Sequence, residues 1–205
     1  MLEAVDLACE RGGRSLFRGL SFALRGGELL RIAGPNGSGK TSLLRIMCGL
    51  LSPTAGAVLW GGAGIRRLRE EYSRRLVYIG HAPAVKEDLT VAENLAIACR
   101  LAGLAVSPRQ IRAALEKFEL SDWPVKRLSQ GQRRRAALAR LLLSQSLPLW
   151  LLDEPFAALD VTATRDVEDL IAAHVARGAA VVYASHQEAR IDATVSRLVD
   201  LVAAA

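Results

Sequence analysis

An eight-residue loop near the start of the chain constrains the fold more than any other sequence feature. A strand-like run at residues 29–33 precedes this loop, and residues 40–48 follow it with helical spacing of apolar positions, up to Gly49. The loop reads GPNGSGKT and matches the pattern GxxxxGK[ST] in a strand–turn–helix context. In a chain of this length, chance produces such a match on the order of once in a hundred sequences. The loop consists of Gly34, Pro35, Asn36, Gly37, Ser38, Gly39, Lys40 and Thr41.

The residue types in this loop suit the binding of a nucleoside triphosphate. Glycines allow positive φ and bring backbone N–H groups within reach of phosphate oxygens, and the helix that starts here adds its partial positive charge. We expect Lys40 to contact the β- and γ-phosphates and the Thr41 hydroxyl to ligate Mg²⁺. The sequence therefore predicts a site for ATP and Mg²⁺.

A second apolar run ends in an acidic pair. Residues 147–152 are followed directly by Asp153 and Glu154. At the carboxyl end of a buried strand, Asp153 can hold Mg²⁺ through water, and Glu154 can act as general base toward the attacking water. Strands often end in acidic residues, so the pair is weak evidence by itself. Together with the phosphate loop it predicts nucleotide hydrolysis.

Strand-like and helix-like segments alternate along most of the chain. Continuous apolar strands between helices indicate a parallel sheet covered on both faces, so the sequence predicts an α/β fold. Residues 1–205 are expected to form a single domain, with a mostly helical insert at about residues 83–135. Strands are predicted at residues 2–9, 20–24, 29–33, 57–60, 77–80, 147–152 and 180–184. Helices are predicted at residues 40–48, 91–120 with a new start at Pro108, 132–143 and 167–176.

Composition excludes several classes of protein. The three cysteines are far apart, with no CxxC or CxxCH pattern, which argues against a disulfide framework, a metal site and covalent haem attachment. No apolar run is long enough to span a bilayer, and the N-terminus does not resemble a signal peptide, so a membrane role would need a partner. The net charge of +6 would suit nucleic acid, but the basic residues are dispersed and we interpret them as a solvated surface.

A pentapeptide between these two motifs opens a helix and points to one family. The segment LSQGQ resembles LSGGQ, the signature of the ABC (ATP-binding cassette) proteins, with Gln130 in place of the first glycine. A serine N-cap would explain the pentapeptide in isolation. In the family, this segment of one subunit caps the γ-phosphate held by the other, which implies a homodimer in the ATP-bound state. The residues with this role would be Ser129, Gln130, Gly131 and Gln132.

Further motifs follow in the order that is usual for the family. Asp160 ends a segment that resembles the D-loop, and His186 resembles the switch histidine at a strand end. His81 stands where most ABC proteins carry the glutamine that links Mg²⁺ and the attacking water to the helical subdomain. The usual adenine-stacking aromatic is missing near Arg11, whose guanidinium is a candidate for that contact. The resemblance implies Glu154, His186 and His81 as catalytic residues.

This resemblance covers essentially the whole chain. It implies a mainly parallel core, an N-terminal antiparallel β lobe and an inserted helical subdomain. Within the family, the pair Gly80-His81 and the short length fit the ATP-binding subunits that serve c-type cytochrome biogenesis. That group implies an ATPase coupled to haem export or handling, peripheral on the cytoplasmic face of the bacterial inner membrane. The implied partners are integral membrane subunits (CcmB-like and CcmC-like), and no motif here would bind haem directly.

Three other interpretations have distinguishing features. Other ABC exporters usually carry glutamine at the position of His81 and have an extra C-terminal stretch. A soluble ABC ATPase acting on nucleic acid would usually fuse two cassettes or insert a coiled coil or zinc module, and here we find only a compact insert, so we expect no nucleic-acid partner. A small-molecule kinase with a phosphate loop would need a lid and would leave LSQGQ unexplained.

Overall fold

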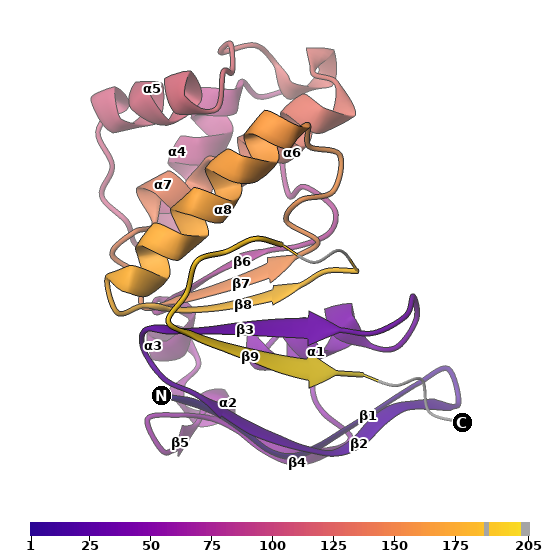
Figure 1. The fold of residues 1–205 in the computed structure, drawn as a ribbon. Coiled ribbons are helices and arrows are strands. Elements are labelled where there is room, and N and C mark those ends of the chain that lie inside the picture. The colour runs from indigo at the N-terminus through magenta and orange to yellow at the C-terminus, as the bar shows by residue number, and fades with distance from the viewer. Residues whose placement is uncertain (187–188, 202–205) are drawn as a thin grey trace.

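In a computed structural model, which describes residues 1–186 and 189–201, a five-stranded sheet forms the middle layer (Figure 1). All its neighbouring strands are parallel, in the order β6-β7-β8-β3-β9. Strands β7 and β8 are buried along their whole length, as expected for continuous apolar runs with helices on one face and a packed core on the other. The strands are β3 (Glu28–Ala33), β6 (Leu76–Ile79), β7 (Leu149–Asp153), β8 (Ala180–Ala184) and β9 (Val195–Asp200).

A second, antiparallel sheet lies below the first, with α1 (Lys40–Met47) between the two (Figure 1). Its strand order is β2-β1-β4-β5. Leu43, Leu44 and Met47 of α1 are fully buried in the cluster that joins both sheets. This packing fixes the start of α1 against the ends of the parallel strands. The strands are β1 (Leu2–Arg11), β2 (Arg14–Leu24), β4 (Ala55–Trp60) and β5 (Ala63–Gly64).

Helices cover the opposite face of the parallel sheet (Figure 1). Three of them begin with a capping box, in which a Ser or Thr hydroxyl and a Glu or Gln side chain satisfy the exposed N–H groups of the first turn. The helices are α4 (Val91–Leu101), α5 (Pro108–Lys117), α6 (Gln130–Leu138), α7 (Arg140–Leu143) and α8 (Val161–Ala176). Shorter pieces are α2 (Ile65–Leu68), α3 (Glu70–Ser73) and the 3₁₀ turn η1 (Val125–Arg127).

The predicted α/β class, parallel core and N-terminal antiparallel sheet are confirmed. Among the differences from the predicted elements are two earlier starts and one additional strand. Helix α8 begins at Val161, earlier than predicted, because the Asp160 carboxylate accepts the Ala163 N–H and caps it. Strand β2 extends back to Arg14, paired along its length with β1. Strand β9 was not predicted, because it lies at a sheet edge and its residues are mostly exposed, so no apolar run marks it.

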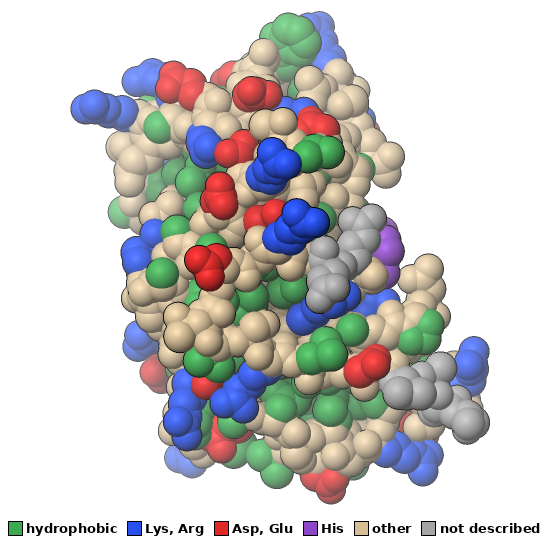
Figure 2. Space-filling model, in the orientation of Figure 1, with side chains coloured by type: hydrophobic (Ala, Val, Ile, Leu, Met, Phe, Trp, Pro, Cys, Tyr) green, Lys and Arg blue, Asp and Glu red, His purple; other side chains and the backbone are tan. Residues whose placement is uncertain are grey.

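Two further observations concern membrane spans and surface charge. Among the described residues, no helix combines the length and the apolar character needed to cross a membrane. Figure 2 shows Lys and Arg interspersed with Asp and Glu on the visible face rather than gathered in one patch. The separation of residues 83–135 as a helical subdomain stays a prediction.

Candidate nucleotide site

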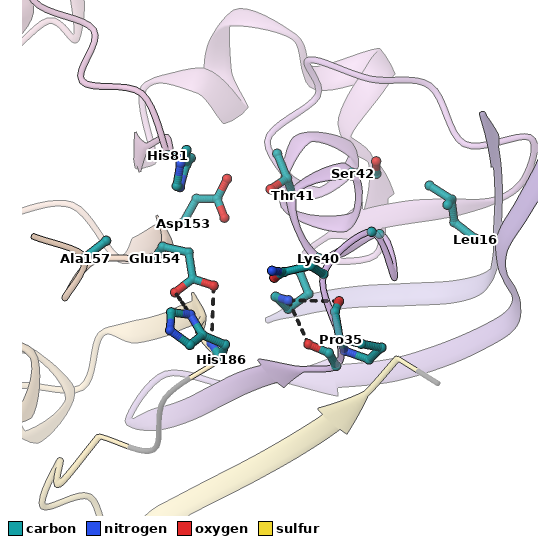
Figure 3. A pocket seen from close by; sticks show the side chains of 14 residues that line it. Leu16, Pro35, Lys40, Thr41, Ser42, His81, Asp153, Glu154, Ala157 and His186 are labelled. Carbon is teal, nitrogen blue, oxygen red and sulfur yellow. Dashed lines mark hydrogen bonds and ion pairs between the residues drawn. The ribbon is translucent and has the colours of Figure 1, made fainter. Parts of the chain in front are cut away.

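A cavity of about 760 Å³ opens where α1 begins and where β7 and β8 end (Figure 3). In an open parallel sheet this carboxyl edge is the usual place for a ligand, since the loops that follow the strands converge there. Three motifs far apart in the chain meet in this cavity. The lining residues are Leu16, Gly34, Pro35, Asn36, Gly37, Gly39, Lys40, Thr41, Ser42, His81, Asp153, Glu154, Ala157 and His186.

The phosphate loop requires glycine at two tightly packed positions. Gly34 has φ +143°, and a Cβ there would lie 2.5 Å from the carbonyl oxygen of Leu201. Gly39 has φ +104°, and a Cβ there would lie 3.1 Å from the Cβ of Leu16. Any other residue would be strained at both positions and would shift the loop. The conformation of the loop therefore depends on glycine at both positions.

Lys40 lies at the start of α1 and is 8% exposed. Its Nζ donates hydrogen bonds to the carbonyl oxygens of Gly34, at 2.7 Å, and Pro35, at 3.2 Å. Nearby, the buried Oγ of Ser38 has no hydrogen-bond partner. A buried ammonium and an unpartnered hydroxyl beside a helix N-terminus form a site with strong attraction for an anion.

Asp153 ends β7 and Glu154 follows it, and the two carboxylates have different environments. Asp153 is 1% exposed, and its Oδ2 has no partner although buried carboxylates are normally paired. Glu154 has φ +49°, and its N–H donates to the Ala184 carbonyl oxygen at 2.8 Å. A positive φ is uncommon for a side chain of this size and marks strain that often accompanies function.

His186 contacts the Glu154 carboxylate from the end of β8 (Figure 3). Its backbone N–H donates to Oε1 at 3.2 Å, and its Nδ1 lies 3.0 Å from Oε2. The glutamate side chain is 13% exposed, while the imidazole is 56% exposed. Thr41 and His81 line the same cavity. The structure thus brings all three sequence-predicted catalytic residues and both predicted Mg²⁺ ligands to one place.

The signature segment lies elsewhere. Ser129 caps α6, accepting the Gln132 N–H on its Oγ, while the Gln132 side chain accepts the Ser129 N–H. The simple N-cap role is therefore realised, and within the described chain no residue of this segment lines the cavity. A Cβ on Gly131 would lie 2.9 Å from the Ala158 carbonyl oxygen, so the first turn of α6 packs closely on the loop that ends at Asp160.

With this geometry in place, the chain can be compared with known proteins. Residues 17–157 match the sequence model of the ABC transporter family. This chain belongs to the ABC transporter family. It is an ABC ATPase, a nucleotide-binding subunit that couples ATP hydrolysis to transport.

One curated relative and two solved structures show how far the likeness extends. The relative is the cytochrome c biogenesis ATP-binding export protein CcmA of Aromatoleum aromaticum, 51% identical over 92% of this chain and 90% of its own length. An ABC transporter ATP-binding protein from Pyrococcus furiosus has a TM-score of 0.82 and 26% identity, covering 98% of this chain and 96% of its own. A bacterial ABC transporter cassette solved as a dimer has a TM-score of 0.83 and 25% identity, covering 98% and 94%.

Sequence reasoning about this ABC ATPase missed several site residues. Leu16 reaches the cavity from β2, whereas Arg11, the candidate for adenine stacking, is exposed and is absent from the lining residues. Arg134 is one of the basic residues that the sequence analysis assigns to a solvated surface, yet it is 3% exposed. Its two arginine neighbours, Arg133 and Arg135, instead form ion pairs near the surface. Helical spacing was the available signal, since Ala137 and Leu138, three and four residues further along α6, are buried.

Proposed function

We propose that this ABC ATPase powers a complex of the bacterial inner membrane in haem export or handling for c-type cytochrome biogenesis. The likeness to the CcmA protein of Aromatoleum aromaticum supports this most, because half of the residues are identical over nine tenths of both chains. His81, in place of the usual glutamine, also fits that group. The proposed partners are CcmB-like and CcmC-like membrane subunits, with this chain peripheral on the cytoplasmic face.

In the proposed mechanism, the phosphate loop binds the triphosphate of ATP. Backbone N–H groups of residues 34–41 and the Lys40 ammonium neutralise the β- and γ-phosphates. Lys40 would exchange its present bonds to the Gly34 and Pro35 carbonyl oxygens for phosphate oxygens. The glycine-rich backbone is held before ATP arrives, and Lys40 exchanges its bonds when ATP binds, so little reorganisation is left for the moment of reaction.

Glu154 is the proposed general base. Its carboxylate accepts the proton of the attacking water, while His186 holds the carboxylate through the two contacts of 3.2 and 3.0 Å. Fixing the base from both the backbone and the ring of His186 limits its rotamers. His186 thereby keeps the carboxylate directed into the cavity.

Thr41 and Asp153 are the proposed holders of Mg²⁺. A hydroxyl and a carboxylate are the oxygen donors this ion prefers, and the unpartnered Oδ2 of Asp153 is a buried acceptor that the protein leaves unsatisfied. When bound, the ion would neutralise charge that develops on the transferring phosphoryl group. His81 contributes a ring nitrogen at the same cavity, which can contact the water or the ion's water shell in place of glutamine.

A second copy of the chain is proposed to complete the site in the ATP-bound state. Ser129, Gln130 and Gly131 would cap the γ-phosphate held by the partner, with Asp160 beside them. The exposure of Ser129, Gln130 and Asp160 supports a role outside their own protomer. Haem and nucleic acid are not among the proposed ligands.

Deletion of the gene tests the biological role. We expect the deletion strain to lack mature c-type cytochromes on a haem-stained gel while its b-type cytochromes persist. Complementation with the wild-type chain should restore them, and complementation with Glu154→Gln should not. Normal c-type cytochromes in the deletion strain would remove this assignment and leave the ATPase activity untouched.

A further inference from the structure

Arg134 is a buried charge that none of the proposed catalytic steps uses. It lies on α6, five residues after the helix cap Ser129, and is 3% exposed. Burial lowers its pKa, and the negative charges of Asp153 and Glu154 act in the opposite direction. An arginine still remains protonated, because its guanidinium does not lose its proton in proteins. A buried cation at this place therefore has to be compensated by its surroundings.

The compensation comes from backbone carbonyl oxygens of two separate loops. Nη2 of Arg134 donates to the carbonyl oxygens of Asp153, at 2.7 Å, and Glu154, at 2.6 Å. Nη1 donates to that of Gly80 at 2.7 Å and reaches that of His81 at 3.4 Å. One planar guanidinium thus connects α6, the helix that the signature segment opens (the signature helix), with the end of β7 and with the segment after β6. A lysine ammonium, which lacks the planar fork, could not hold both segments at once in this geometry.

These contacts act on the backbone that carries the proposed base. Glu154 has φ +49°, a conformation that an L-residue adopts only when its surroundings impose it. Its N–H is held by Ala184 and its carbonyl oxygen by Arg134, so the peptide groups on both sides of the side chain are fixed. Removing the guanidinium would free one of these two restraints and leave all four carbonyl oxygens without this donor.

We propose that Arg134 is a positioning residue that sets the Glu154 carboxylate and ties it to the signature helix of the same protomer. Because that helix is proposed to contact the nucleotide of the second copy, Arg134 links the base in one site to engagement of the other. The inference rests on the proposed hydrolytic role of Glu154. A purely structural role would predict a loss of stability alone.

The test compares Arg134→Met and Arg134→Lys with Arg133→Met in the full chain. Arg133 is the next residue on α6 but pairs with Glu87 at the surface, so it controls for the loss of a charge on this helix. For Arg134→Met we expect kcat to fall by about 10²-fold, the effect of misplacing a catalytic group by about 1 Å. The Kd for ATP should stay within about twofold, because the phosphate loop is not touched. Arg134→Lys should recover part of the rate, and Arg133→Met should match the wild type.

A double-mutant cycle with Glu154→Gln separates positioning from structure. If Arg134 acts through Glu154, then adding Arg134→Met to Glu154→Gln should lower single-turnover hydrolysis no further. Additive losses, or equal loss of ATP binding and kcat, would overturn the proposal. Should Arg134→Met fail to fold, the same cycle is run with Arg134→Lys. A wild-type chain without ATPase activity would remove the proposed function itself, whereas an active wild type matched by both Arg134 variants would remove only this inference.

Discussion

The phosphate loop and the signature segment both contain small and polar residues at the start of a helix, yet the two regions differ in burial and in what surrounds them. Lys40 and Asp153 are almost fully buried and line a cavity formed by residues of their own chain. Ser129 and Gln130 are exposed, and the Ser129 hydroxyl caps the first turn of α6. The first region is ready to bind a ligand in one copy of the chain. The second has its proposed ligand only when another copy is present, so binding and hydrolysis should respond differently to substitution.

The largest expected effect is at Glu154, the proposed base, which needs ATP bound by the phosphate loop and capped by the signature segment of the second copy. Glu154→Gln should reduce hydrolysis by at least about 10²-fold, because an amide cannot accept the proton of water. ATP binding should persist, and an ATP-bound dimer should accumulate, as measured by size-exclusion chromatography with multi-angle light scattering. The exposed Glu116→Gln serves as control. A variant that keeps more than about a tenth of the wild-type rate would contradict the proposed base.

A mixing experiment sharpens the distinction between the regions. Lys40→Ala should lose ATP binding, since it removes the one side-chain cation of the loop, while Ser129→Ala should bind ATP and fail to hydrolyse it. An equal mixture should regain about a quarter of wild-type activity, because half of the dimers are mixed and each has one intact site. The measurement is steady-state ATPase activity across mixing ratios. A mixture no more active than either variant alone would break the shared-site proposal.

Gly131 offers a smaller, more local test of the exposed region. A Cβ there would lie 2.9 Å from the Ala158 carbonyl oxygen, so Gly131→Ala must displace the loop that ends at Asp160. Hydrolysis should fall by about tenfold while ATP binding by a single chain is unchanged. Gly64→Ala is the matched control, because its φ is −60° and nothing lies within 4 Å of the added Cβ. Equal ATPase rates for both variants would mean that this contact does not matter.

The smallest expected effect on activity lies outside both regions, at His174 on α8. Burial lowers the pKa of His174 to about 4, and Arg177 adds to the shift. The imidazole is 1% exposed and stacks on Trp150 with ring centroids 3.6 Å apart. Because the unfolded chain takes up this proton first, the stability that the neutral ring contributes is complete above about pH 6.5 and is lost as pH falls toward 4.

Chemical denaturation at several pH values measures the contribution of His174 to the free energy of unfolding. Between pH 7 and 5 the free energy of unfolding should fall by about 2 kcal/mol through His174. His174→Phe keeps a ring against Trp150 and removes the titration, so its stability should depend less on pH by that amount. ATPase activity at pH 7 should stay within about twofold of wild type, because the residue touches neither region. If the free energy of unfolding of His174→Phe falls with pH as steeply as that of the wild type, His174 is not the source of the pH dependence.

The sequence by itself determined the parts of this protein whose requirements are local. The phosphate loop, the acidic pair after β7 and the cap at Ser129 each depend on backbone conformation within a few residues, so contiguous motifs reveal them. The α/β class followed from apolar runs alternating with helices. The start of α8 was missed although its signal, the cap residue Asp160, is local too.

Only the tertiary structure decided which distant residues meet. The contact of Glu154 with His186 joins positions 32 residues apart, Leu16 reaches the cavity from another sheet, and Arg134 turns inward between two surface arginines. Edge strand β9 likewise exists through pairing with β3 rather than through its own apolar content. Such contacts depend on how the layers pack, and side chains of the same type look alike in a sequence whether they are solvated or buried.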